Sequence, residues 1–212
     1  MAVTTRARTI LTLALGLALA AAPRAGAVPV VFGSSAYEFI AADGISWFSA
    51  RPAAEASTYL GIHGHLVTIF SSAENAFVLS LLGGIPNSVW IGATDEVVEG
   101  VWRWVTGEQF WTGGGSGTPG PDVAYANWGP GQPDDFGTGQ DHATMFGLAV
   151  PGRAGLWDDG GSGGGSPGDI YRRSGYVVEY DLKPVPEPST LLLRLGGGAL
   201  SRLRGRSRRR SG

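Results

Sequence analysis

The run Gln132-Pro133-Asp134-Asp135-Phe136-Gly137-Thr138-Gly139-Gln140-Asp141 organises the sequence, together with the shorter run Trp157-Asp158-Asp159. The two runs concentrate carboxylates and side-chain amides in a chain in which only 16% of the residues are charged. Glycine and proline are frequent in and around both runs, which predicts loops. Like charges on loops repel one another unless a cation lies among them, and calcium takes about six to eight oxygen ligands. The two runs therefore predict a calcium site that is built from two loops and is open on one side.

The sequence on either side of the acidic runs predicts short strands and long loops. A Gly/Pro-rich segment from Trp111 to Pro130 directly precedes the first run. Segments of this length without regular structure are usually functional or disordered, and the neighbouring acidic run favours function. Strands are predicted over Ala143 to Leu148 and Gly175 to Tyr180, with a Gly-rich loop at 160–168 between them.

The first half of the chain predicts two helices among short strands. Apolar residues at near-helical spacing predict a helix over Ile45 to Leu60. Ser71-Ser72-Ala73-Glu74 is a capping box that opens a second helix, which ends at Gly83-Gly84. Strands are predicted over 36–40, 66–69, 89–93 and 101–105, with an acidic turn at 94–100. This order indicates the α+β class, with a loop-rich second half.

His63 and His65 flank Gly64, and such a pair can bind zinc. No third ligand is evident, so a turn that leads into the next strand is preferred.

Composition narrows the class of protein. The chain has 212 residues, of which 43% are hydrophobic, so one globular domain with a sizeable core is expected. The net charge of −2 argues against a nucleic-acid partner. The absence of cysteine excludes disulfides, thiolate metal sites and cysteine nucleophiles.

A family resemblance rests on several short motifs that occur in a fixed order. They are Gly64-His65-Leu66-Val67-Thr68-Ile69, Ser72-Ala73-Glu74-Asn75, Trp90-Ile91-Gly92, Glu99-Gly100, Trp104, Asn127-Trp128, Gln132-Pro133-Asp134 and Trp157-Asp158-Asp159. In this order they resemble the C-type lectin-like domain, over about Tyr37 to Asp181. The resemblance implies a double-loop fold, in which small antiparallel sheets are flanked by two helices.

The resemblance also implies how a sugar would be bound. Its principal calcium ligands fall on Gln132, Asp134, Gln140, Asp158 and Asp159. In the family a cis proline stands at the position of Pro133, and two vicinal sugar hydroxyls bind the calcium while the ligand side chains hydrogen-bond them. The Gln-Pro-Asp order resembles the galactose-type motif, whereas Glu-Pro-Asn marks the mannose type. Phe136 falls near the aromatic ring that stacks on the sugar in galactose binders, although simple loop packing is an equal alternative.

A second, auxiliary calcium site is implied as well. Asp95, Glu99, Asp135 and Asp141 fall on the positions of its ligands in the family. Its expected role is to rigidify the long loop rather than to contact sugar. The alternative is that Asp95 and Glu99 are solvated charges of a turn.

The chain departs from the family pattern at three points. Gln140 stands where the family usually has Glu, and Asp158 stands where it usually has Asn. We interpret these two changes as charge compensation, because Asp134, Asp158 and Asp159 keep three negative charges at the principal site. His142 and Val178 occupy positions that are usually cysteine, so the fold is expected to depend on the packing of Trp47, Trp90, Trp102, Trp104 and Trp128 and on calcium.

Both ends of the chain resemble export signals. Residues 1–27 have the basic start, the short apolar run and the small-residue cleavage site of a signal peptide, in preference to a buried or anchoring helix. Residues 183–212 contain Pro186-Glu187-Pro188, a Leu-rich stretch and an Arg-rich end, which resembles the PEP-CTERM sorting signal of bacterial envelope proteins. That resemblance implies processing by an exosortase. The match is imperfect because Arg194 interrupts an apolar run that is too short to span a bilayer, and a disordered basic tail is the alternative.

These observations predict an exported protein of the bacterial envelope or the extracellular space, with residues 28–182 as its lectin-like domain. The expected function is calcium-dependent binding of a carbohydrate, either a galactose-type glycan or an exopolysaccharide. The alternative is a lectin-like envelope or matrix protein that binds protein partners without sugar. An enzyme is not expected, because the carboxylates that could serve a glycosidase must stay ionised as calcium ligands.

Overall fold

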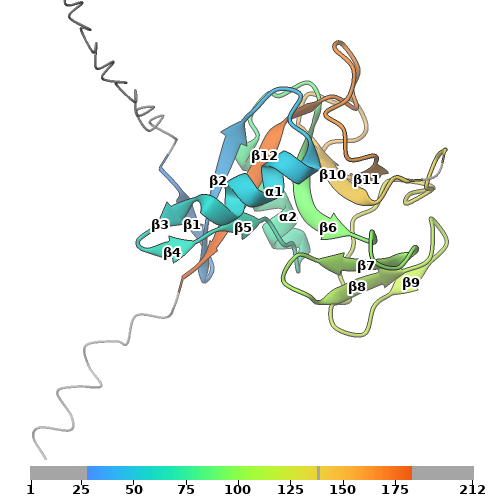
Figure 1. Cartoon of the computed structure of the whole chain (residues 1–212), viewed down its shortest axis with the longest axis horizontal. Helices are drawn as coiled ribbons and strands as arrows, with labels where there is room; N and C mark the ends of the chain where they lie inside the picture. Colours follow the sequence, from blue (N-terminus) through green and yellow to red (C-terminus); the bar gives the residue numbers. More distant parts are fainter. Residues whose placement is uncertain (1–27, 138, 183–212) are drawn as a thin grey trace, which may run out of the picture.

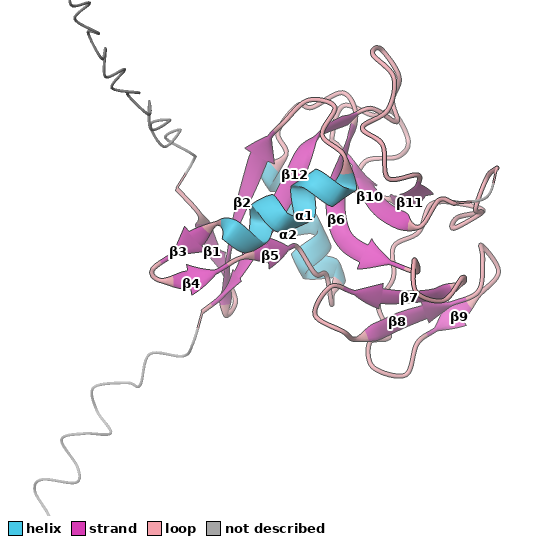
Figure 2. Ribbon diagram, viewed as in Figure 1, coloured by secondary structure: helices cyan, strands magenta, loops and turns pink. Residues whose placement is uncertain are grey.

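The computed structural model of the protein describes residues 28–137 and 139–182 (Figure 1). In chain order its elements are β1 (Val30–Phe32), β2 (Ser35–Ala41), α1 (Trp47–Ala56), β3 (Thr58–Tyr59), β4 (Ile62–His63), β5 (His65–Leu66), α2 (Ser72–Leu81), β6 (Ser88–Thr94), β7 (Val101–Trp104), β8 (Gln109–Thr112), β9 (Thr118–Pro119), β10 (His142–Phe146), β11 (Trp157–Gly160) and β12 (Arg173–Asp181). The main sheet has the order β1-β2-β12-β6-β7-β8-β9, and β10 pairs with both β6 and β11. Figure 2 shows the two helices packed against this sheet, so the predicted α+β class is confirmed.

The first and last long strands lie side by side. β2 and β12 pair antiparallel from Ala41 opposite Gly175 to Ser35 opposite Asp181. β12 also runs parallel to β6, and Leu182 N donates to Ser34 O at 2.9 Å. The described chain therefore closes on itself at one edge of the fold, and the segment between β6 and β12 extends away from that edge (Figure 1).

Alternate side chains of β6 and β12 build two cores on opposite faces of the sheet. Ile91 and Val177 belong to the core that packs against α2. Trp90 and Val178 belong to the core that packs against α1. Successive residues of each strand face opposite cores, so the same pair of strands, β6 and β12, contacts both helices.

Both predicted helices form, each behind a serine cap. Ser46 Oγ accepts a hydrogen bond from Ser49 N at 3.2 Å, and Ser71 Oγ accepts one from Glu74 N at 3.2 Å. The carboxylate of Glu74 accepts from Phe70 N at 2.7 Å, which ties the chain entering the helix to its first turn.

The first helix is shorter than the predicted span of 45–60. Ser57 ends it, because its side-chain hydroxyl donates to Ala54 O at 2.6 Å. Thr58 and Tyr59 then pair with β4.

Three other expectations about secondary structure are wrong in part. The strand predicted over 66–69 is limited to β5 (His65–Leu66), because Thr68 N donates to the side chain of Glu179 on β12 and not to a backbone oxygen of that strand. The segment from Trp111 to Pro130 contains the end of β8 and all of β9. The run Trp157-Asp158-Asp159 is a buried strand and not a loop, because it pairs with β10.

The histidine pair lies in the β4–β5 region, as the turn interpretation requires. His63 Nδ1 lies 3.2 Å from Glu55 O, and His65 Nε2 lies 3.3 Å from Asp181 Oδ2. Each ring therefore has its own separate partner.

The two positions that usually hold cysteine in the family, 142 and 178, hold buried side chains instead. Val178 is fully buried, and His142 packs against Trp47 with 4.2 Å between ring centroids. Of the five tryptophans expected to support the fold, Trp47, Trp90, Trp102 and Trp104 are buried, whereas Trp128 is partly buried against the core.

The two terminal segments expected to direct export, 1–27 and 183–212, lie outside the described residues. Within residues 28–137 and 139–182, neither helix combines the length and the apolar character needed to cross a bilayer.

Gly92 on β6 provides a test of this packing. A Cβ at this position would lie 2.5 Å from Leu66 O and 2.9 Å from Val67 O. We expect Gly92→Ala to lower the free energy of unfolding by about 1–3 kcal/mol, as measured by urea denaturation, because backbone atoms must shift. Gly84→Ala is the matched control, since a Cβ there meets nothing within 4 Å. Equal stability of the two variants would contradict this account of the contact.

Candidate functional site

The long loop that carries the first acidic run is anchored on β11. Trp128 forms a parallel bridge with Trp157. Gly129 N donates to Trp157 O, and Trp157 N donates to Asn127 O, both at 2.8 Å. These contacts place the acidic run beside Asp158 and Asp159, which follow on the same strand.

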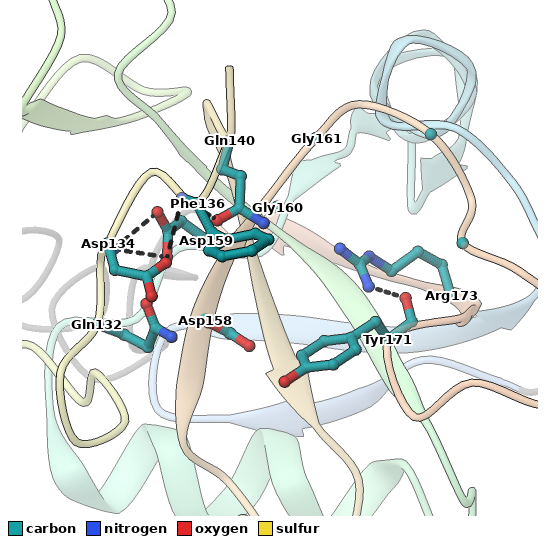
Figure 3. Close-up of a pocket in the computed structure, with 12 residues that line it drawn as sticks. Gln132, Asp134, Phe136, Gln140, Asp158, Asp159, Gly160, Gly161, Tyr171 and Arg173 are labelled. Carbon is teal, nitrogen blue, oxygen red and sulfur yellow. Dashed lines mark hydrogen bonds between the residues drawn. The ribbon is translucent and has the colours of Figure 1, made fainter. Parts of the chain in front are cut away.

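One pocket of about 650 Å³ lies between this loop and β11. Its volume is in the range of sites for small molecules. Figure 3 shows the side chains that line it. All five predicted principal ligands and Phe136 are among them: Gln132, Asp134, Phe136, Gln140, Asp158 and Asp159. The Gln132–Pro133 peptide bond is cis, and the residues on both sides of Pro133 line this pocket.

Asp159 holds the loop to the strand. Its carboxylate accepts hydrogen bonds from Asp134 N at 3.0 Å and from Asp135 N at 2.7 Å. Gln140 closes the same loop, because its Oε1 accepts from Phe136 N at 2.8 Å. Phe136 itself is 81% exposed, so its ring is not part of the core.

The donor atoms of the pocket fit a hard cation. Gln132 Oε1 is buried and has no hydrogen-bond partner. A buried acceptor without a partner is costly, and a cation can supply the missing contact. The other candidate ligands are carboxylate and amide oxygens, which are the ligands that calcium takes.

The charges of the pocket also favour a bound cation. Burial and, to a smaller extent, the charge of the neighbouring Asp159 together raise the pKa of Asp158 to about 6. Burial also raises the pKa of Asp159. Arg153, whose side chain is 43% exposed and lies 3.9 Å from Asp158, and the buried Arg173 offset this charge only in part, because the pKa of Asp158 is still raised. The folded chain therefore brings carboxylates together without enough positive charge to offset them.

A second acidic cluster lies on the other side of Asp159. Oxygen atoms of Asp95, Glu99 and Asp141 all lie within 4.8 Å of one another. A cavity of about 270 Å³ beside them is lined by Asp95, Glu99, Asp135 and Asp159, among others. The four predicted auxiliary ligands therefore lie around one region, with Asp135 on the wall of the cavity.

Asp95 is the most perturbed acid of this cluster. Its Oδ2 accepts from Gly100 N at 2.9 Å, whereas its Oδ1 is buried without a partner. Burial, together with the nearby charges of Glu99 and Asp141, raises the pKa of Asp95 to about 7. Burial and the charges of Asp135, Asp141 and Asp159 raise the pKa of Glu99. The unpartnered oxygen and the crowded negative charge fit a second cation.

The sequence did not indicate the far wall of the first pocket. Gly160, Gly161, Gly163, Gly165, Tyr171 and Arg173 form it. The only signal was that Tyr171-Arg172-Arg173 precedes the last predicted strand, where alternation turns one of two adjacent arginines inward.

Comparisons with known proteins agree with this geometry. The family model described as the lectin C-type domain matches residues 58–160. Halomucin of Haloquadratum walsbyi is 34% identical over 148 residues, which are 68% of this chain and 1% of halomucin. Asialoglycoprotein receptor 1 of Rattus norvegicus is 39% identical over 93 residues, which are 42% of this chain and 28% of the receptor. This chain thus spans less than a third of either relative.

The fold also matches a solved structure. The C-type lectin CEL-I from Cucumaria echinata superposes with a TM-score of 0.56 at 20% identity, covering 76% of this chain and 99% of CEL-I. The predicted C-type lectin fold is therefore confirmed.

The raised pKa of Asp95 predicts how the ion-free protein responds to pH. A carboxyl whose pKa is higher in the folded state stabilises the fold below its unfolded pKa of 3.8, and this contribution is lost as pH rises through about 7. We expect Asp95→Asn to become more stable than the wild type as pH rises from 4 to 8 in chelator. The gap at pH 8 should be on the order of 2 kcal/mol after solvent screening is allowed for.

Urea unfolding at several pH values measures this gap. Asp122→Asn is the control, because Asp122 is exposed and its bonded oxygen, which accepts from Gln109 N at 2.9 Å, is preserved in Asn. A gap that does not change with pH would contradict the prediction.

Proposed function

Because the lectin C-type domain model matches residues 58–160 and the fold is that of a C-type lectin, we propose that the protein is a calcium-dependent carbohydrate-binding module of galactose type. C-type lectin domains are binding modules without enzymatic activity, so the pocket is a binding site and not a catalytic one. The proposal is carried by one observation: five oxygen-bearing side chains, from a loop and from a strand distant in the chain, converge on one pocket.

In this proposal the principal calcium is held by Gln132, Asp134, Gln140, Asp158 and Asp159. When bound, the ion supplies positive charge and coordination positions for two vicinal hydroxyls of the sugar. The carboxylates orient those hydroxyls by accepting their hydrogen bonds, which are charge-assisted and therefore strong. Asp159 has the additional role of fixing Asp134 and Asp135 in place through their backbone N–H groups.

The auxiliary calcium is assigned to Asp95, Glu99, Asp135 and Asp141. Asp135 supports a role in ordering the loop, because its Oδ1 already accepts from Gly139 N at 2.6 Å and from Gln140 N at 3.0 Å. Neutralising the crowded acids of this cluster would stabilise the loop that carries the first pocket.

Two features support a galactose-type ligand. The Gln132-Pro133-Asp134 order matches the galactose-type motif, and the exposed ring of Phe136 on the pocket wall is available to stack on the apolar face of a sugar. The rat relative is by its name a receptor for asialoglycoproteins, which is consistent with a glycan ligand. Export, processing by an exosortase and attachment to the cell envelope stay predictions.

Binding to galactose and mannose resins tests the proposal. We expect retention on galactose in calcium, weaker retention on mannose, and complete elution by chelator.

Retention on galactose resin should also fall between pH 7 and pH 5, because Asp158, whose pKa is raised to about 6, must lose its proton to bind the ion. Binding of protein partners that persists in chelator, without any sugar binding, would support the alternative of a lectin-like envelope or matrix protein.

Charge compensation at the principal site predicts a specific pattern among three variants. Gln140→Glu adds one negative charge, Asp158→Asn removes one, and the double variant restores the three charges of the wild type. We expect the double variant to bind calcium with near wild-type affinity and each single variant to differ from it by about threefold or more. Isothermal titration with calcium measures this. Weaker binding by the double variant than by both single variants would refute the compensation.

A further inference from the structure

Arg173 at the start of β12 is a buried arginine whose charge is felt by Asp158 and Asp169 but is not paired directly with either carboxylate. Its side chain is almost fully buried, with the residue only 4% exposed. Nη1 donates to Ser88 Oγ at 3.2 Å and to the backbone oxygen of Tyr171. The guanidinium lies over the ring of Trp90, 4.4 Å from its centroid. No ion pair to Arg173 occurs among the residues that the structure describes.

An arginine in this environment is unusual. Arginine is rarely fully buried unless its charge is paired, because removing the charge from water is costly. Nε is buried and has no hydrogen-bond partner. Nη2 likewise makes no hydrogen bond within residues 28–137 and 139–182. The N–H groups of Nε and Nη2 therefore have no acceptor within the described chain, and Nη2, which lies beside Gly160 at the pocket wall, is the one that a bound group would meet first.

The chain leaves space for this guanidinium at the wall of the first pocket. Arg173 and Tyr171 both line that pocket. Figure 3 shows Arg173 directed toward the pocket from the side opposite Gln132 and Asp134. A Cβ at Gly160 would collide with Arg173 Nη2, so the glycine at this position makes room for the charge.

We propose that Arg173 forms a second subsite of this pocket, which recognises an anionic group on the bound saccharide. This inference rests on the proposed function and narrows its ligand to acidic sugars, such as uronic acids or sulfated hexoses. The acidic side of the pocket holds the cation and the sugar hydroxyls, while the opposite side holds the anionic substituent of the same sugar.

The chemistry of these unpaired N–H groups favours a carboxylate. A guanidinium presents parallel N–H groups that match the two oxygens of a planar carboxylate, and such charge-assisted pairs are strong. Contact with Trp90 fixes the plane of the guanidinium, so little rotamer freedom is lost when the acceptor arrives. Burial lowers the pKa of Arg173 to about 10, so the group remains charged at neutral pH.

Titration with matched sugars tests the subsite. The full chain in saturating calcium is titrated with galactose, galacturonate, the methyl ester of galacturonate and galactose 6-sulfate, and mannose with mannuronate serves as a second pair. We expect the acid to bind about tenfold more tightly than the neutral sugar, and the methyl ester to lose this preference. Titration with galactose 6-sulfate shows whether the subsite prefers a sulfate or a carboxylate. A preference for the sulfated sugar that depends on Arg173 would support the same subsite.

For each variant, we compare its affinity for the acidic sugar with its affinity for the matching neutral sugar, and we use the ratio of the two. Arg173 also contacts Ser88 and Trp90, so damage to the fold would weaken both sugars and leave the ratio unchanged. We expect Arg173→Gln to reduce the ratio to about one and Arg173→Lys to keep part of it. Arg172→Gln is the matched control, because the adjacent Arg172 is paired with Asp43 at 2.6 Å and does not line the pocket.

The outcomes separate this inference from the proposed function. Calcium-dependent binding of a neutral sugar without a preference for its acid would overturn the subsite alone. A preference that survives Arg173→Gln would also overturn it. Binding of galacturonate that resists chelator and is lost in Arg173→Gln would support the subsite and contradict the calcium site. Binding of none of these sugars would overturn both.

Discussion

The hydrogen bonds between the carboxylate of Asp159 and the backbone of Asp134 and Asp135 are the constraint on which the candidate site depends. They join a loop to a strand residue that lies 25 residues beyond Asp134 and 24 residues beyond Asp135 in the chain. Asp159 lines both acidic cavities, so one side chain fixes the wall that they share. This arrangement also buries other carboxylates of the two cavities close together, and the pKa values of Asp95 and Asp158 are raised as a result. The site is therefore shaped by the chain but is electrostatically incomplete without a cation.

The rest of the fold compensates for the lack of cysteine. Val178 fills one of the usual cysteine positions inside the core that contains α1. His142 fills the other, packed against Trp47. Both residues lie on strands that pair with the central part of the sheet, where burial and packing stabilise them. Trp47 and Trp90 are buried in the same core as Val178.

The sequence predicted the helices, the order of the main strands and the grouping of the acidic residues, because each has a local signal. Ser71 and Glu74 mark a helix start, and Gln132-Pro133-Asp134 is a recognisable motif. The strand character of Trp157-Asp158-Asp159 was missed, since two adjacent aspartates are typical of loops until pairing with β10 is known. Arg173 was missed for a similar reason. Its burial depends on Trp90, Ser88 and Gly160, which are remote in sequence, and no local pattern reports such a contact. Whether the acidic residues hold calcium stays a prediction.

The pairing of β2 with β12 has a consequence for how the domain can be presented. Because these strands lie side by side, residues 28 and 182 emerge from the same edge of the fold (Figure 1). The acidic loop and β11 lie at the other end of the molecule in the same view. A tether attached at either end would leave the surface that carries the acidic pocket pointing away from the tether. Neighbouring copies anchored in this way could engage one polymeric glycan simultaneously, so weak individual contacts would combine into avidity.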